Sequence, residues 1–73
     1  MNDDFYKQLG IKIKKLRRRR FLTQQQLAEQ IGKGLNFVGK IEIAFSKPSL
    51  DTLIEIANAL GVDVSELTNF SNN

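Results

Sequence analysis

The side chains with the clearest chemical potential are basic and amide groups in the middle of the chain. Four consecutive arginines, Arg17 to Arg20, precede a stretch that begins at Gln24 and contains Asn36 and Lys40. Guanidinium and ammonium groups neutralise phosphates, and an asparagine amide can form two hydrogen bonds with the edge of adenine. These residue types indicate phosphate neutralisation combined with base-edge hydrogen bonding, which is the chemistry of binding to duplex DNA.

Charge is distributed unevenly along the chain. Residues 1–40 hold ten of the eleven basic side chains and three acidic ones, a net charge of +7, whereas residues 41–73 carry a net charge of −4. This asymmetry predicts one basic face and one acidic face. A basic face is the expected footprint of a domain that lies on phosphates with its first half.

The composition argues against other kinds of chemistry. The chain has no cysteine and no histidine, so it offers no disulfide framework, no thiolate metal site and neither of those side chains as nucleophile or general base. It has no glycine-rich phosphate loop. Asp51 and Glu55 are better explained as a carboxylate that complements the helix dipole and as surface charge than as a catalytic pair. We therefore expect no enzyme activity, no metal, no cofactor and no small-molecule ligand.

Two short helices joined by a glycine turn are predicted to position the polar groups. Thr23 and Gln26 have the spacing of a capping box, which predicts a helix that begins at Gln24 and ends at Gly32. With Gly34 as a weak cap, a second helix is expected over about residues 34–43. The outward face of that second helix carries Leu35, Asn36, Gly39 and Lys40.

Three further helices complete an all-α prediction for one domain, residues 1–73. The apolar spacing predicts a helix from about Asp4 to Arg20, with its inward face formed by Leu9, Ile13 and Leu16. Another begins after Pro48, with Ser49 as cap, and is expected to bury Leu50, Leu53, Ile54, Ala57 and Leu60 before Gly61. A last helix opens at Asp63, with Glu66 completing a capping box, and carries Leu67 and Phe70.

Several motifs together are typical of one family. Counted from Gln24, a small residue at the fifth position, glycine at the ninth, a β-branched residue at the fifteenth and an aliphatic one at the eighteenth form the helix-turn-helix pattern. The other motifs are L-x-x-x-I-x-x-L-R in Leu9–Arg17, I-E at Ile41-Glu42, P-S-L-D-T-L in Pro48–Leu53 and A-x-A-L-G-V-x-x-x-E-L in Ala57–Leu67. The stretch 13–67 resembles the phage repressor and Cro (XRE-like) regulators. That resemblance implies a five-helix lambda-repressor-like domain whose helix-turn-helix spans 24–43.

The resemblance also implies roles for individual residues. Arg17 would be partly buried and paired with Glu42. Asn36, Gly39 and Lys40 would face the bases, as would Leu35, which could press on a thymine methyl. The residues expected to meet phosphates are Gln24, Lys33, Gly34, Lys47, Arg19 and Arg20. The alternative for the arginines is a solvated surface, and the resemblance does not decide among Arg18, Arg19 and Arg20.

Five positions depart from the usual pattern of this family. Lys33 stands where an apolar residue is usual, and Gly34 where a serine or threonine usually serves as cap and phosphate contact. Phe21 and Ala44 stand where a glycine normally ends a helix, so a left-handed backbone there would cost about 1 kcal/mol each. Gly39 lies inside the second helix of the motif, which it weakens by up to about 1 kcal/mol relative to alanine. In return for this weaker helix, the lack of a side chain at Gly39 would allow the helix to come close to the DNA groove.

We therefore expect a cytoplasmic, sequence-specific transcriptional regulator that binds double-stranded DNA and no membrane. A recognition helix at about 34–43 would enter the major groove of an inverted-repeat operator, read by a homodimer that pairs through Val62, Leu67 and Phe70. The alternative is an antitoxin or adaptor of the same fold that acts through protein contacts. The apolar residues that keep this alternative open are Ile11, Ile43, Phe45, Val62 and Phe70.

Overall fold

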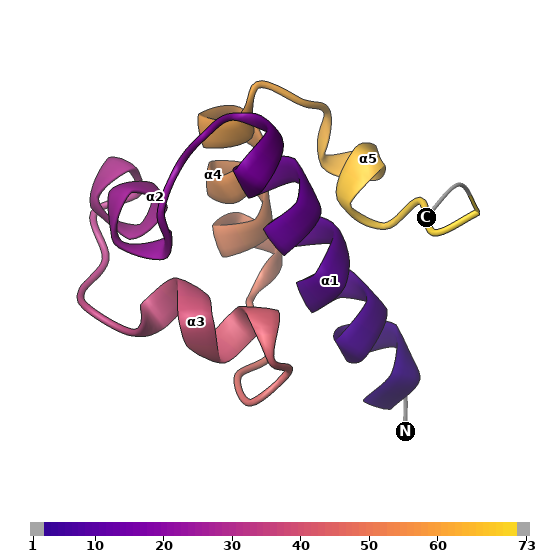
Figure 1. The fold of residues 1–73 in the computed structure, drawn as a ribbon. Coiled ribbons are helices and arrows are strands. Elements are labelled where there is room, and N and C mark those ends of the chain that lie inside the picture. The colour runs from indigo at the N-terminus through magenta and orange to yellow at the C-terminus, as the bar shows by residue number, and fades with distance from the viewer. Residues whose placement is uncertain (1–2, 72–73) are drawn as a thin grey trace.

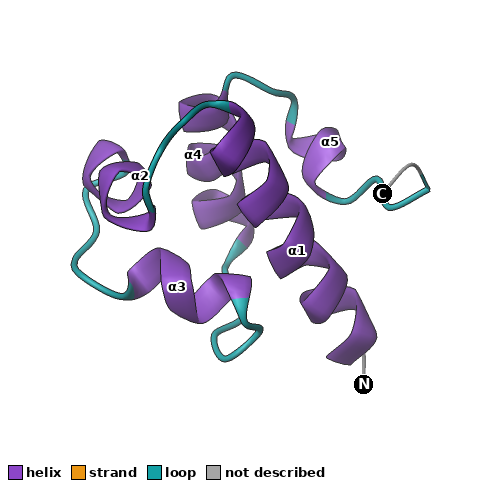
Figure 2. Cartoon of the chain, in the orientation of Figure 1, coloured by secondary structure: helices purple, strands orange, loops and turns teal. Residues whose placement is uncertain are grey.

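The structure, a computed structural model, describes residues 3–71, which form five α-helices and no strand. The helices are α1 (Asp3–Arg19), α2 (Gln24–Gln30), α3 (Phe37–Glu42), α4 (Leu50–Leu60) and α5 (Val64–Leu67). In Figure 1, α2 and α3 lie on one side of the long α1 and α5 lies on the other, while loops account for the remainder in Figure 2. The all-α prediction is confirmed. Within the described range, no helix has the length and apolar character needed to cross a membrane.

All five helices contribute to one apolar core. The predicted inward face of α1 is confirmed, because Leu9, Ile13 and Leu16 are each at most 5% exposed. The other buried apolar side chains are Leu27, Ala28, Val38, Ile41, Ile56, Ala57, Leu60 and Leu67. This core fixes the angle between α2 and α3, on which the polar face of the motif depends.

The predicted start and end of α2 are confirmed. The Gln26 amide donates to Thr23 Oγ1 at 3.0 Å, and the Thr23 amide donates to Gln26 Oε1 at 2.8 Å, which completes the capping box. After the helix, Gly32 has a φ of 71°, a left-handed conformation that a glycine adopts without strain. Local sequence signals therefore determine both boundaries.

The start of α3 differs from the prediction of about residue 34. Asn36, with a φ of 72°, is the N-cap, and Gly34 is not. Gly34 has no side chain that could accept hydrogen bonds from the first amides of a helix. Instead, the Phe37 amide donates a hydrogen bond to the Gly34 carbonyl at 3.3 Å, which closes a turn. Leu35 and Asn36 therefore lie in the turn before α3 rather than on its outward face.

The cap of α4 is confirmed, but its predicted inward face is confirmed only for Ala57 and Leu60, which are each 1% exposed. Ser49 Oγ accepts a hydrogen bond from the Thr52 amide, as expected. However, Leu50 is 66% exposed, Ile54 is 40% exposed and Leu53 is half-buried, while Ile56 is fully buried. Thr52 can face inward because its hydroxyl oxygen accepts a hydrogen bond from Ser49 Oγ. The buried face is thus Thr52, Ile56, Ala57 and Leu60.

The last helix is shorter than predicted. Asp63 caps α5 by accepting a hydrogen bond from the Ser65 amide, whereas the Glu66 carboxylate lies 3.6 Å from the Lys12 ammonium of α1. Phe70 lies beyond the end of α5, half-buried, with its ring 5.5 Å from that of Phe5. The predicted helical placement of Phe70 is therefore wrong, because its packing partner lies on α1.

A close crossing of α1 and α3 depends on Gly10, which the sequence analysis did not single out. A Cβ at this position would lie 2.7 Å from the Ile41 carbonyl oxygen and 2.8 Å from the Glu42 carbonyl carbon. Real Cβ atoms do not come this close to backbone atoms. Gly10 thereby sets the distance between α1 and the end of α3.

Candidate nucleic-acid interface

A buried hydrogen-bond network joins α1, the loop that follows it, the start of α2 and the end of α3. Arg17 donates from Nε to Glu42 Oε2 at 2.6 Å and from Nη2 to Glu42 Oε1 at 3.1 Å. A third guanidinium nitrogen, Nη1, donates to the Leu22 carbonyl at 2.7 Å, and Gln24 Nε2 donates to Glu42 Oε1 at 2.9 Å. Arg17 and Glu42 are only 8% and 7% exposed. The network therefore fixes the start of α2 against the end of α3.

A surface hollow of about 350 Å³ lies beside this network. Four of its lining residues are Gln24, Asn36, Gly39 and Lys40, so the structure brings together three predicted base-reading residues and one predicted phosphate-binding residue. A Cβ at Gly39 would lie 3.1 Å from Gln24 Oε1. The glycine inside α3 thus leaves room for the Gln24 side chain.

Ile43 is a fifth lining residue of this hollow that the sequence analysis did not assign to DNA. It follows the last residue of α3 and is 74% exposed. Its position four residues after Gly39 is the signal that could have placed it on the same face. Leu35 is 73% exposed in the turn before α3, and a Cβ added to Gly34 would meet only open space.

Three lysines near α3 each lie over an aromatic ring. The ammonium of Lys33 is 5.4 Å from the ring centre of Phe37. The ammonium of Lys40 is 6.0 Å from that of Phe45, and the ammonium of Lys47 is 5.3 Å from that of Tyr6. Because a ring face attracts a cation within about 6 Å, each ring favours side-chain conformations that keep the lysine ammonium group above it. Positive charge is thereby held before, within and after α3.

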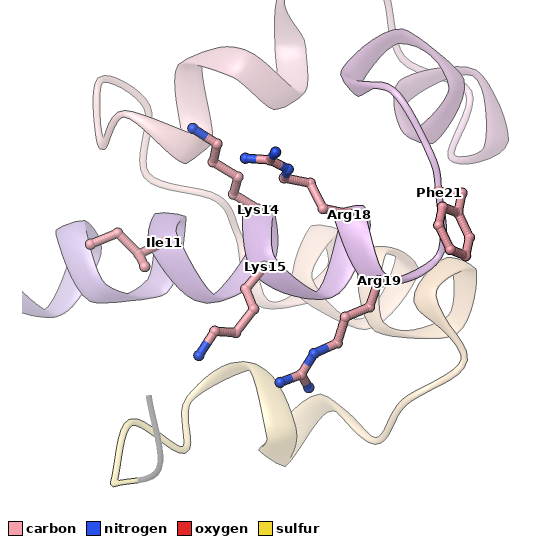
Figure 3. Close-up of a pocket in the computed structure, with 6 residues that line it drawn as sticks. All are labelled: Ile11, Lys14, Lys15, Arg18, Arg19 and Phe21. Atoms are coloured by element: carbon pink, nitrogen blue, oxygen red, sulfur yellow. The ribbon is translucent and has the colours of Figure 1, made fainter.

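The arginine run divides over different sides of α1. In Figure 3, Arg18 points with Lys14 toward the side of α3, whereas Arg19 points with Lys15 toward the side of α5. Arg20 lies against the end of α4, since a Cβ at Gly61 would be 3.3 Å from Arg20 Nη1. The structure therefore does not bring Arg19 and Arg20, the two arginines assigned to phosphates, to the hollow.

The residues predicted to form a dimer interface are not equally available. Leu67 is 0% exposed and packs in the core of its own chain, so its predicted place in an interface is wrong. Val62 and Phe70 are half-buried and pack against the same core. Only parts of these two side chains face outward.

Comparison with known proteins agrees with this architecture. A family model described as helix-turn-helix matches residues 13–67. The immunity repressor protein of Bacillus phage phi105 is 42% identical over 59 residues, which are 81% of this chain and 41% of the phage protein. The HTH-type transcriptional regulator y4dJ of Sinorhizobium fredii is 34% identical over 64 residues, which are 88% of this chain and 83% of that protein. The chain belongs to the helix-turn-helix family of the phage repressor and Cro (XRE-like) type, as its motifs predicted.

Solved structures show the same fold. The restriction-modification controller protein C.AhdI of Aeromonas hydrophila aligns with a TM-score of 0.82 and 29% identity, covering 85% of this chain and 94% of that one. The clp gene regulator ClgR of C. glutamicum aligns with a TM-score of 0.81, covering 86% of this chain and 82% of that one. ClgR is only 22% identical, so its likeness concerns the fold alone. Similarity to the phage repressor, in contrast, spans less than half of that protein's length.

Proposed function

We propose that this chain is a sequence-specific DNA-binding transcriptional regulator that places α3 and the preceding turn in the major groove. The observation that carries the proposal is the hollow lined by Gln24, Asn36, Gly39 and Lys40 beside the Arg17–Glu42 pair. An exposed amide and an exposed ammonium there can reach base edges. The Arg17–Glu42 pair holds α3 against α1, and the hydrogen bond from Gln24 to Glu42 holds α3 against the start of α2.

Gln24 is the residue proposed to bind a phosphate. A glutamine amide group has two N–H donors, and Gln24 uses Nε2 to bond Glu42. The second N–H of the same nitrogen remains for a phosphate oxygen. Lys33 and Lys47, which lie before and after α3, would add charge-assisted contacts to phosphates. This arrangement would fix the depth of α3 in the groove.

Asn36 and Lys40 are the proposed base-reading side chains. Both are exposed at the hollow, and Asn36 presents its side chain from a left-handed turn just before α3. An asparagine can pair with N6 and N7 of adenine, and a lysine with the acceptors of guanine. Gly39 would let the backbone of α3 approach the bases closely, and Leu35 would make an apolar contact with them.

The operator is proposed to be an inverted repeat bound by two copies of the chain. One short α3 reads only a few base pairs, and a twofold pair would place two such helices about 34 Å apart, one turn of duplex. Val62 and Phe70 remain the candidate contacts. Sedimentation tests this proposal: Val62→Asp should weaken self-association, and circular dichroism melting should establish that the variant is folded, since Val62 also packs against the core. A wild-type monomer at every concentration, free and on DNA, would contradict it.

The alternative is a protein-binding role, which the exposed apolar side chains Ile11, Phe21 and Phe45 favour, at 57%, 92% and 75% exposure. Binding to random duplex DNA at increasing salt separates the two roles. Each phosphate contact contributes a slope of about −0.9 to log affinity against log salt. A slope of several units supports the DNA-binding proposal, and a slope near zero overturns it in favour of the protein-binding role.

A further inference from the structure

The outer surface of α1 carries basic charge that the proposed interface does not use. Four cations project there, Lys14, Lys15, Arg18 and Arg19, and they line a shallow groove of about 670 Å³ with an apolar residue near each end (Figure 3). Among residues 3–71, the two ion pairs are Lys12–Glu66 and Arg17–Glu42. The four cations are therefore not neutralised by any described acidic side chain.

These four side chains form two pairs on opposite edges of α1. Lys14 and Arg18 are four residues apart, about one turn, and both point toward the side of α3. Lys15 and Arg19 have the same spacing and point toward the side of α5. Each edge of α1 thus carries one lysine and one arginine, and the two pairs have the same charge but point in different directions.

The edge with Lys14 and Arg18 is continuous with the proposed DNA-binding surface. Arg17, beside Arg18 in the chain, reaches across to Glu42, whose other oxygen accepts from Gln24 at the hollow. At the other end of this edge, Gly10 brings the α1 backbone against the end of α3. This edge of α1 therefore borders the surface that is proposed to meet DNA.

We propose that Lys14 and Arg18 form a second phosphate-binding site, which grips the DNA strand beside the hollow and carries no sequence information. This inference rests on the proposed function. Their side chains are long, flexible and unpaired, and they can each reach a phosphodiester oxygen of one strand. Lys15 and Arg19 face α5 and take no part.

Charge-matched double variants of the full chain test this directly. Lys14→Gln with Arg18→Gln removes the proposed contacts, and Lys15→Gln with Arg19→Gln removes the same charge from the other edge. Fluorescence anisotropy would measure the affinity of wild type and both variants for a random duplex at several salt concentrations. Circular dichroism melting would show that each variant is folded.

The first variant is expected to flatten the slope of log affinity against log salt by about 1.8 per subunit, since each lost phosphate contact removes about 0.9. The Lys15 and Arg19 variant should keep the wild-type slope. Equal flattening in both variants would overturn the inference in favour of diffuse charge, and an unchanged slope in both would also overturn it. If the wild type itself shows no salt dependence, the proposed function fails and this inference fails with it.

Specificity gives a second readout. Because phosphates are the same in every sequence, Lys14→Gln with Arg18→Gln should weaken a selected operator and a random duplex by the same factor. A loss confined to the operator would mean that these side chains read bases, which overturns the proposal.

Discussion

Arg17 in α1 and Glu42 at the end of α3 are joined by two side-chain hydrogen bonds, although 25 residues separate them in the chain. Both side chains are buried, and the carboxylate also accepts the Gln24 amide. The pair therefore connects the framework helix, the start of α2 and the helix proposed to read DNA.

Breaking this pair from one side should be costly. Arg17→Met or Glu42→Leu alone strands a buried charge, so each should lower the free energy of unfolding by about 3–5 kcal/mol. The double variant should lose much less than the sum of the two. Urea unfolding of the four proteins measures this cycle, and strict additivity would show that the two side chains do not stabilise each other.

The parts of the fold that sequence reasoning predicted correctly are those with local causes. The capping box of Thr23 and Gln26 and the left-handed Gly32 involve residues a few positions apart, so their spacing alone specifies them. Phe21 and Ala44 also adopt left-handed backbone, with φ of 57° and 62°, although their residue types do not favour it and sequence reasoning supplied only its cost.

The features that sequence reasoning missed depend on contacts between distant segments. Apolar residues occur on nearly every side of α4, so periodicity could not show that Ile56, rather than Leu50, faces the core. Likewise, Gly10 is an ordinary helical glycine until α3 is packed against it.

Gly10→Ala should destabilise the protein by about 1–3 kcal/mol, because overpacking against the backbone of α3 outweighs the gain of up to about 1 kcal/mol in helix propensity. Gly34→Ala is the matched control, since a Cβ there meets nothing within 4 Å and φ is not positive. It should change stability by less than about 0.5 kcal/mol. Thermal melting compares the two, and equal effects would contradict the close crossing.

Phe21→Gly should stabilise the protein despite removing an aromatic ring. The ring is 92% exposed and contributes little packing, while the left-handed backbone costs a non-glycine residue about 1–2 kcal/mol. The greater freedom of glycine in the unfolded chain offsets about 0.5–1 kcal/mol of that gain. Phe21→Ala keeps the strain and should show no such increase in melting temperature. A loss of stability in Phe21→Gly would indicate that the ring packs against its own chain.

Asn36→Gly should relax base preference without disturbing the turn before α3, because glycine accepts the φ of 72° that alanine would strain. We expect a loss of about 1–3 kcal/mol of discrimination at one or two base pairs. Gln24→Ala should instead weaken all sequences more evenly. Competition binding with single-base operator variants measures both, and equal losses on operator and random DNA in Asn36→Gly would show that Asn36 reads no base.

Selection of bound fragments from random duplex DNA tests the central claim most directly, because it asks whether the purified chain distinguishes one sequence from another. Sequence-specific recognition by two copies of α3 predicts enrichment of an inverted repeat whose half-sites are centred about 34 Å apart. The selected fragment should outcompete a scrambled duplex, and Asn36→Gly should reduce that advantage. Failure to enrich any motif over repeated rounds, with equal binding of selected and scrambled DNA, would contradict the account.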